Sequence, residues 1–150
     1  MNPFAALPRR VEIRDMTLRD GLQSLPQVVP LAEKLQIHDL LAVAGVRDFQ
    51  VTSFVNPTRV PQLADAEALW AELRSREGRY NVLIANRRGF DRAVAAAALD
   101  MEMVISASES YNRINVRRSR DESLGELDGI LEAAGGSGAQ VSLVIANAFH

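Results

Sequence analysis

Short runs of apolar residues recur along the chain, separated by stretches in which apolar residues have helical spacing. Continuous apolar runs bounded by Gly, Pro or Asn are typical of strands in a buried sheet. Five such runs are predicted strands: Val11 to Asp15, Val46 to Phe54, Tyr80 to Ala85, Met101 to Ala107 and Gln140 to Phe149. Four helices are predicted between them: Leu31 to Ala44, a segment from Pro61 to Gly78, Phe90 to Leu99, and a segment that begins at Ser119 and is terminated by Gly135 to Gly138.

The order of these elements predicts the fold class. Strands that alternate with helices form a parallel sheet with right-handed crossovers, and the helices pack against the sheet. No linker or repeat divides the chain, so residues 1–150 are expected to form one α/β domain. The segment Met1 to Pro8, which contains two prolines, reads as a lead-in.

Apolar stripes on the predicted helices are expected to face the sheet. They are Leu31, Leu35, Leu40, Leu41 and Ala44 in the first helix, Leu63, Ala66, Leu69, Trp70 and Leu73 in the second, and Leu124, Leu127, Leu131 and Ala134 in the fourth. Trp70 at this spacing is interpreted as a core residue, with ligand stacking as the alternative. His38 is expected on the helix surface. Ser119 and Glu122 have capping-box spacing, and the polar segment Ser108 to Arg118 is predicted to be a long loop.

Polar residues follow the carboxyl end of each predicted strand. They are Arg19 and Asp20 after the first strand, Thr52 and Ser53 at the second, Asn86 after the third, Ser106, Ser108 and Glu109 after the fourth, and Asn147 and His150 at the fifth. Taken singly, each is an ordinary strand terminus or loop residue. In parallel α/β folds, however, these ends converge on the face that carries the ligand site. Their joint placement favours a functional site there.

The segment Arg19-Asp20-Gly21 is the strongest candidate for chemistry. Arg19 can hold a carbonyl oxygen that becomes negative during a reaction. Asp20 can ligate a hard divalent cation through oxygen, and Gly21 permits a sharp turn. The alternative is a solvated Arg-Asp pair in a polar loop.

Composition and charge narrow the functional classes. The 150 residues suit one domain, 47% of them are hydrophobic, and the formal net charge is −2. Arginine runs without interleaved aromatic residues disfavour a nucleic-acid surface. The absence of cysteine excludes disulfides, thiolate metal sites and a Cys nucleophile. No apolar run is long enough to span a bilayer, and Met1 to Arg10 lacks the order of a secretory signal, so a cytoplasmic protein without membrane or nucleic-acid partners is expected.

Two sequence blocks carry a resemblance to a known family. Arg19-Asp20-Gly21-Leu22-Gln23 resembles the hydroxymethylglutaryl-CoA lyase family, within a group of metal-dependent aldol-type lyases and synthases on a (β/α)8 barrel. Val51 to Pro57, followed by Val60-Pro61-Gln62, agrees. Weaker matches are Asn86 to Phe90, Ala107 to Ser110 with Asn115, and Ala146 to Phe149. The resemblance covers nearly the whole chain and implies a partial TIM barrel. Its about five parallel strands and four intervening helices are those that the order of elements predicts.

The resemblance also implies a reaction and residue roles. The family cleaves a 3-hydroxyacyl-CoA to acetyl-CoA and a ketone or keto acid, with a divalent cation of the Mg or Mn type and no organic cofactor. Carried onto this sequence, Asp20 is a metal ligand and Arg19 is the catalytic residue that stabilises the enolate. Arg19, Gln23, Ser53 and Asn86 are the substrate-binding residues. Fixed positive charge suits this chemistry, because breaking the C–C bond leaves a carbanion equivalent.

The sequence departs from the family pattern in two respects. Gln50 stands where the family has a Glu, and an amide can be neither a general base nor a charged partner. The family's other metal ligands, a His-x-His pair and an Asn, and its Cys-bearing loop lie in a second half that these residues do not include. The chain is therefore expected to be a truncated fragment whose exposed barrel edges favour marginal stability or homo-oligomer formation.

Two other functions remain open. Met16-Thr17-Leu18 resembles the Claisen-type acyl-CoA synthases of the same group, whereas Leu22, where those synthases usually carry Glu, points back to the lyases. A non-catalytic remnant or interaction module is the third hypothesis, favoured by Gln50 and the missing half.

Overall fold

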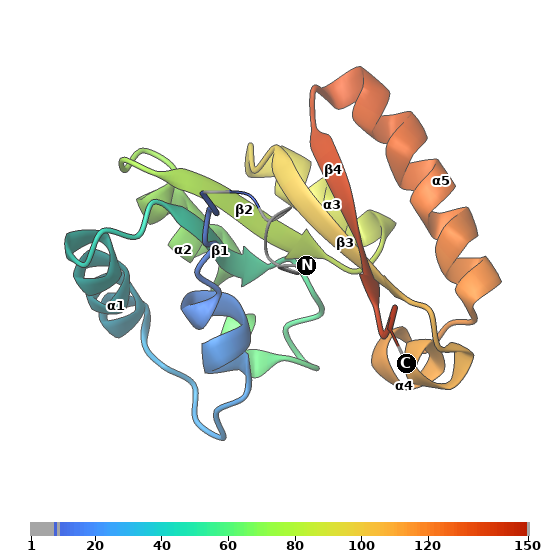
Figure 1. Cartoon of the computed structure of the whole chain (residues 1–150), viewed down its shortest axis with the longest axis horizontal. Coiled ribbons are helices and arrows are strands. Elements are labelled where there is room, and N and C mark those ends of the chain that lie inside the picture. Colours follow the sequence, from blue (N-terminus) through green and yellow to red (C-terminus); the bar gives the residue numbers. More distant parts are fainter. Residues whose placement is uncertain (1–7, 9, 150) are drawn as a thin grey trace, which may run out of the picture.

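A computed structural model of the chain describes residues 8 and 10–149. The predicted lead-in, apart from Pro8, and the candidate residue His150 lie outside these residues. Four strands form one parallel sheet in the order β1-β2-β3-β4: β1 Asp48–Ser53, β2 Arg79–Ile84, β3 Asp100–Ser106 and β4 Gln140–Ala146. The predicted parallel α/β architecture is confirmed, because each strand pairs with the next one along the chain (Figure 1).

The expected first strand, Val11 to Asp15, does not form, although its last residue lies beside β1. Only Asp15 pairs, in a parallel bridge with Phe49 beside β1. The Asp15 N–H donates to the Asp48 carbonyl at 2.9 Å, and the Gln50 N–H donates to the Asp15 carbonyl at 2.8 Å. Residues 11–14 are exposed and add no further ladder bonds. The backbone therefore joins the sheet at one residue, Asp15, and then turns into the Arg19 segment.

Within the described residues, five α-helices and two short helical segments precede or connect the strands. They are η1 Thr17–Gly21, α1 Leu31–Val43, η2 Pro61–Leu63, α2 Ala66–Leu73, α3 Arg87–Ala95, α4 Glu109–Val116 and α5 Arg120–Ser137. Helix α2 packs on β1, α3 on β2, and α5 on β3 and β4, and Figure 1 shows α2 and α3 behind the sheet. No helix among the described residues is long and apolar enough to cross a membrane.

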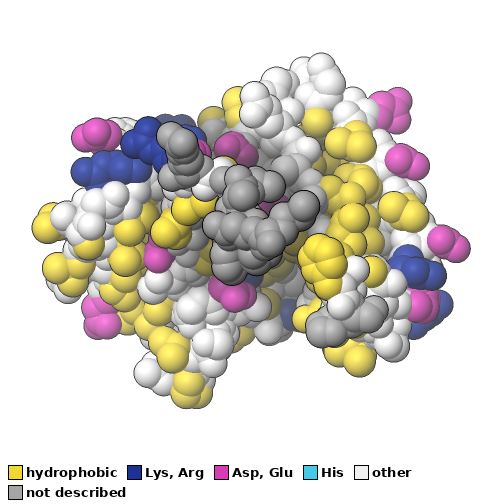
Figure 2. All heavy atoms as spheres, viewed as in Figure 1, with side chains coloured by type: hydrophobic (Ala, Val, Ile, Leu, Met, Phe, Trp, Pro, Cys, Tyr) yellow, Lys and Arg dark blue, Asp and Glu magenta, His cyan; other side chains and the backbone are white. Residues whose placement is uncertain are grey.

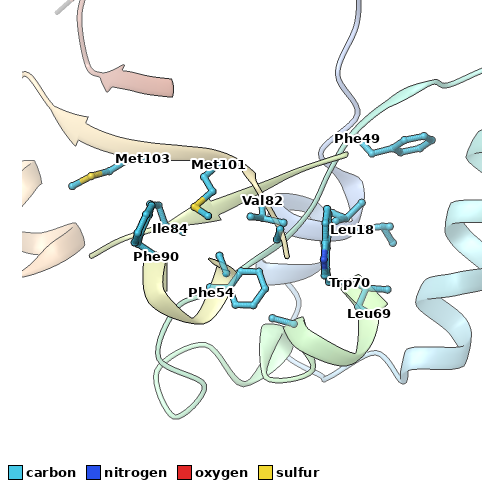
Figure 3. Packing of buried hydrophobic residues seen from close by; sticks show 14 of the residues in the cluster. Leu18, Phe49, Phe54, Leu69, Trp70, Val82, Ile84, Phe90, Met101 and Met103 are labelled. Atoms are coloured by element: carbon cyan, nitrogen blue, oxygen red, sulfur yellow. The ribbon is translucent and has the colours of Figure 1, made fainter. Parts of the chain in front are cut away.

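The core lies between the sheet and α2, α3 and α5. Figure 3 shows Phe54, Trp70, Val82 and Phe90 in this core; they come from the end of β1, from α2, from β2 and from α3, respectively. Trp70 is 6% exposed and its indole N–H donates to the Ala96 carbonyl at 3.0 Å. The prediction that Trp70 is a core residue is confirmed, since burial with a satisfied N–H leaves no face for ligand stacking.

Helix α1 confirms its predicted apolar stripe only in part, because Leu31, Leu35 and Leu41 pack against the core but are only partly buried. Leu40 of the expected stripe is exposed, whereas Lys34 and His38 are buried. The Lys34 ammonium donates to the Asp65 carboxylate at 2.6 Å and the Gln62 carbonyl at 2.7 Å. His38 packs beside the Phe49 ring, with centroids 4.9 Å apart, so its expected surface position is wrong. Polar partners outside α1 offset the cost of burying these side chains.

The predicted polar loop before the fourth predicted helix is instead mostly helical. Helix α4 begins after Ser108, whose hydroxyl accepts the Tyr111 N–H at 3.3 Å. Asn112 is buried, accepts the Ser106 N–H at 3.1 Å and donates to the Ser123 hydroxyl at 2.8 Å. The segment lacks an apolar stripe, which is why a loop was predicted. The hydrogen bonds of Asn112 hold α4 in place instead.

Helix α5 confirms its predicted start and two of the four residues of its predicted buried face. Ser119 and Glu122 form the capping box. Leu124 and Leu131 are exposed, while Leu127 is buried together with Ile130 and Ala134. The helix also continues through Gly135 and Gly136 to a left-handed Gly138, with φ of 74°. Figure 2 shows the resulting apolar surface along β4, where Leu143, Val144 and Ile145 are exposed as well.

Candidate active site

The Arg19 segment forms a π-helical turn, η1, directly after the bridge at Asp15. The Asp15 carboxylate accepts the Thr17 N–H at 2.9 Å and the Thr17 hydroxyl at 3.0 Å, which holds the start of the turn. Leu18, 1% exposed, anchors it in the core. Isolated π-helical turns occur frequently at functional sites, because they re-aim side chains. Here the turn presents Arg19 and Asp20 on adjacent positions.

Arg19 is held between two polar side chains. Its Nε–H donates to Gln50 Oε1 at 2.6 Å, and its Nη1 group donates to Asp20 Oδ1 at 2.6 Å. Only 11% of the Arg19 side chain is exposed. Burial lowers the pKa of the Arg19 guanidinium, and the negative charges of Asp20 and Glu102 oppose that shift. A guanidinium remains charged under any such shift, so the site holds a fixed, oriented positive charge.

Gln50 connects Arg19 to the interior strands. Its Nε2 group donates to Asn81 Oδ1 at 2.8 Å on β2 and to Glu102 Oε1 at 3.0 Å on β3. Asn81 in turn donates to Asp100 at 2.9 Å. Sequence reasoning missed Asn81 and Glu102. The available signal was a Glu between two methionines near the start of the run Met101 to Ala107, where an unpaired charge is costly.

Asp20 is the exposed member of the pair. Its side chain is 64% exposed, and within the described part of the chain that side chain contacts Arg19 alone by hydrogen bond. The structure brings no group of three or more His, Cys, Asp or Glu side chains together within residues 8 and 10–149 in a way that could hold a metal ion. Asp20 therefore offers one carboxylate to a cation. A single such ligand binds Mg or Mn weakly, because these ions take several oxygen ligands.

Two of the three remaining predicted substrate-binding residues have hydrogen-bond partners elsewhere in the fold. Ser53 is fully buried and donates to the Leu83 carbonyl at 3.1 Å. Asn86 caps α3 by accepting the Gly89 N–H at 2.8 Å, and Gln23 is exposed. No hydrogen bond links these side chains to Arg19 or Asp20 in the described part of the chain. Their substrate-binding roles stay predictions.

Polar residues at the ends of β3 and β4 do converge. The Ser106 hydroxyl donates to Asn147 Oδ1 at 2.9 Å and accepts the Ser108 N–H at 3.1 Å. Glu109 instead faces solvent, where the Arg120 N–H and the neighbouring arginines lower its pKa. Thr52 is buried, and its hydroxyl has no partner among the described residues.

A cavity of about 1170 Å³ lies between the loop after β1, the start of α3 and the end of α4. Its lining includes five arginines, namely Arg59, Arg88, Arg92, Arg117 and Arg118, together with Asn86, and no carboxylate from residues 8 and 10–149. Arg92 and Arg118 are held by the carbonyls of Val55 at 2.8 Å and Ala85 at 3.2 Å. The other three have no ion-pair partner among the described residues. This cavity is suited to a multiply charged anion.

Comparison with known proteins gives one consistent result. The HMGL-like family model matches residues 10–150. The mitochondrial hydroxymethylglutaryl-CoA lyase of Rattus norvegicus is 39% identical over 132 residues, and the cytoplasmic 3-hydroxy-3-methylglutaryl-CoA lyase of Danio rerio is 40% identical over 136 residues. These matches cover 87% and 90% of this chain but 41% of each relative. The chain thus spans about two fifths of the length of these curated relatives.

A solved structure agrees with the sequence matches. An HMG-CoA lyase from Acinetobacter baumannii, in complex with coenzyme A and 3-methylmalate, superposes with a TM-score of 0.84 and is 32% identical in sequence. The match covers 92% of this chain and 45% of that structure. The four-stranded sheet and its helices therefore correspond to part of a TIM barrel, as the resemblance implied.

Proposed function

The chain belongs to the HMGL-like family, and on that premise we propose that it carries the Arg-Asp part of the active site of a carbon–carbon lyase acting on 3-hydroxyacyl-CoA thioesters. The proposed substrate resembles hydroxymethylglutaryl-CoA, and the products are acetyl-CoA and a ketone or keto acid. The observation that carries the proposal is the buried, doubly held guanidinium of Arg19. Cleavage of the C–C bond leaves an enolate, which requires fixed positive charge at the thioester oxygen.

In this proposal Arg19 donates hydrogen bonds to the oxygen on which the enolate charge develops. The contact with Gln50 fixes the guanidinium plane before substrate arrives, so no reorganisation is required during the reaction. Asp20 would be one ligand of a divalent cation. When bound, such a cation polarises the substrate oxygens as a Lewis acid. Gln23, Ser53 and Asn86 remain the proposed substrate-binding residues.

The arginine-lined cavity supports an acyl-CoA substrate. Coenzyme A carries phosphates, which arginine binds with bidentate geometry, and the cavity contains Asn86, one of the proposed substrate residues. Calorimetric titration of the chain with CoA and with pantetheine provides the test. Replacing Arg59 and Arg88 by Gln is expected to weaken CoA binding about tenfold or more and to leave pantetheine binding unchanged. The control is Arg113→Gln on α4, which does not line the cavity. Equal loss for both ligands would contradict the proposal.

Turnover tests the reaction itself. We expect the 150 residues alone to show no turnover, because Asp20 is one cation ligand where several are needed. Robust metal-dependent release of acetyl-CoA by this chain would overturn that expectation. In the complete gene product, Arg19→Lys is expected to lower kcat about 100-fold, since Lys cannot reproduce the oriented guanidinium. Arg87→Lys, at an exposed arginine paired with Asp91, is the matched control.

Two alternatives rest on specific observations. A Claisen-type acyl-CoA synthase is suggested by Met16-Thr17-Leu18, and screening with hydroxymethylglutaryl-CoA, citramalyl-CoA, and acetyl-CoA plus keto acids separates it from the lyase. A non-catalytic remnant or interaction module is suggested by Gln50 and by the single carboxylate at the metal position. Calorimetric titration of Mg or Mn into the chain and its Asp20→Ala variant discriminates: equal binding favours the remnant.

The open edge of the sheet supports a further expectation. Strand β4 has one neighbour, and its residues Leu143, Val144 and Ile145 are exposed. An edge of this kind pairs readily with another chain, so we propose that the isolated residues form homo-oligomers. A compact, cooperatively melting monomer in size-exclusion chromatography and far-UV circular dichroism would count against it.

The relatives include mitochondrial and cytoplasmic enzymes, and a cytoplasmic location remains our proposal.

A further inference from the structure

The charge of Arg19 is not fully balanced by its direct partner. Asp20 contacts the guanidinium at 2.6 Å, but its side chain is 64% exposed, so water screens the attraction. If Asp20 also ligates a cation, its charge is shared with that cation. A guanidinium with 11% exposure requires further compensation from the protein interior.

Gln50 cannot supply charge, but its amide is held in one orientation. Its Nε2 group faces two acceptors, Asn81 Oδ1 at 2.8 Å and Glu102 Oε1 at 3.0 Å. In the unmodified chain the Asn81 amide is held in this orientation, because its own Nδ2 donates to Asp100 at 2.9 Å. With both amide protons used on that side, Gln50 Oε1 must face the Arg19 Nε–H. A flipped amide would set a donor against Arg19 and an oxygen against the Glu102 carboxylate.

Glu102 is the charged end of this chain of hydrogen bonds. It lies on β3, and 13% of its side chain is exposed. Its other oxygen is 3.5 Å from Arg14, whose shorter contact, at 2.8 Å, is with Asp48. Glu102 is therefore not mainly neutralised by Arg14, and its charge is available to polarise Gln50. Hydrogen bonds in series reinforce each other in a low-dielectric interior.

We propose that Glu102 is a positioning residue that orients Arg19 and balances its charge through the Gln50 amide. The role of Glu102 in catalysis rests on the proposed function above, because Arg19 is the group that would hold the enolate. The relay itself is a property of the folded chain. It joins β3, β1 and η1, and it predicts that the carboxylate could equally be carried at position 50.

The test follows the Nε–Hε signal of Arg19 by NMR, identified by its loss in Arg19→Lys. In the unmodified chain this proton should exchange slowly with water, because it donates to Gln50. Glu102→Gln is expected to accelerate the exchange about tenfold, since the second amide no longer dictates which way Gln50 points. The double variant Gln50→Glu/Glu102→Gln moves the carboxylate next to Arg19. Asn81 must then turn its Nδ2 group from the exposed Asp100 to the new carboxylate, and slow exchange is expected to return. Glu126→Gln, a half-buried carboxylate that contacts Arg118, is the control and should change nothing.

Unchanged exchange in Glu102→Gln, or fast exchange in the double variant, would overturn the proposal. If Glu102→Gln does not fold, the double variant decides: a folded protein with slow exchange supports the relay, and an unfolded one contradicts it. No measurement here requires substrate or turnover. Failure of the lyase proposal would therefore appear in the acetyl-CoA assay, while failure of the relay would appear in the Arg19 signal.

Discussion

Gly89 lies where helix α3 meets the end of β1, at the wall of the arginine-lined cavity. A Cβ added at this position would lie 2.5 Å from the Phe54 carbonyl oxygen, closer than such atoms approach in proteins. The obstacle is backbone, so no side-chain rotation relieves it. Phe54 is itself tied to β2, because its N–H donates to the Leu83 carbonyl at 2.9 Å. Gly89→Ala must therefore push α3 away from the sheet.

We expect Gly89→Ala to reduce the free energy of unfolding by about 1–3 kcal/mol, the usual cost of overpacking. For a chain of this size that corresponds to a fall in Tm of about 2–12 °C. Urea unfolding followed by the fluorescence of Trp70, the single tryptophan, measures it. The control is Gly125→Ala in α5, where nothing lies within 4 Å of the added Cβ. That variant should gain about 0.5–1 kcal/mol from its better helix propensity.

If Gly89→Ala is as stable as the unmodified chain while Gly125→Ala shows its gain, the contact between α3 and the Phe54 carbonyl is not tight. That result would mean that α3 and the loop after β1 separate without cost. CoA titration adds an independent readout, because movement of α3 displaces two cavity arginines, Arg88 and Arg92. A destabilised variant with unchanged CoA affinity would indicate that CoA does not bind in this cavity.

Three further predictions concern polar groups that the fold buries or caps. Asp65→Asn should lower the free energy of urea unfolding by about 3 kcal/mol, because it leaves the buried Lys34 ammonium without a counter-charge. Lys34→Met should lower it less, since Asp65 retains access to water. Equal losses in the two variants would contradict this prediction. Asn112→Ala should cost about 2–4 kcal/mol and accelerate amide hydrogen exchange in α4, because the Ser106 N–H loses its acceptor; unchanged exchange would contradict it. The Ser119 N–H lowers the pKa of Glu122 below its ordinary 4.5, so this cap stabilises the fold above that pH and is lost as the pH falls through the lowered value. Glu122→Gln should remove that acid-side loss from the Tm profile, and an unaltered profile would exclude the cap as its source.

Much of the fold could be predicted because the signals are local. Apolar runs and helical spacing located the four strands and most helices, and the capping box at Ser119 was identified from two residues three positions apart. The failures occurred where a local pattern had a distant partner. Val11 to Asp15 resembled a strand, yet residues 11–14 find no neighbour to pair with. Ser108 to Arg118 lacked an apolar stripe, yet Asn112 anchors it as a helix.

The candidate site divides in the same way. The adjacent Arg19 and Asp20 were recognised as a candidate site from their own segment, and their roles stay predictions. The arginine-lined cavity was not predicted, because its residues come from three separate connections and become a cavity only when these lie side by side.

The sequence by itself therefore determined the alternation of strands and helices, the family and the position of the Arg-Asp pair, because each depends on residues close together in the chain. The tertiary structure alone decided that Lys34 and His38 are interior and that Gln50 lies between Arg19 and a carboxylate 52 positions away. The physical reason is that a polar side chain is buried only when a partner offsets its desolvation. Periodicity reports which face of an element turns inward, but it contains no information about which distant group will meet that face.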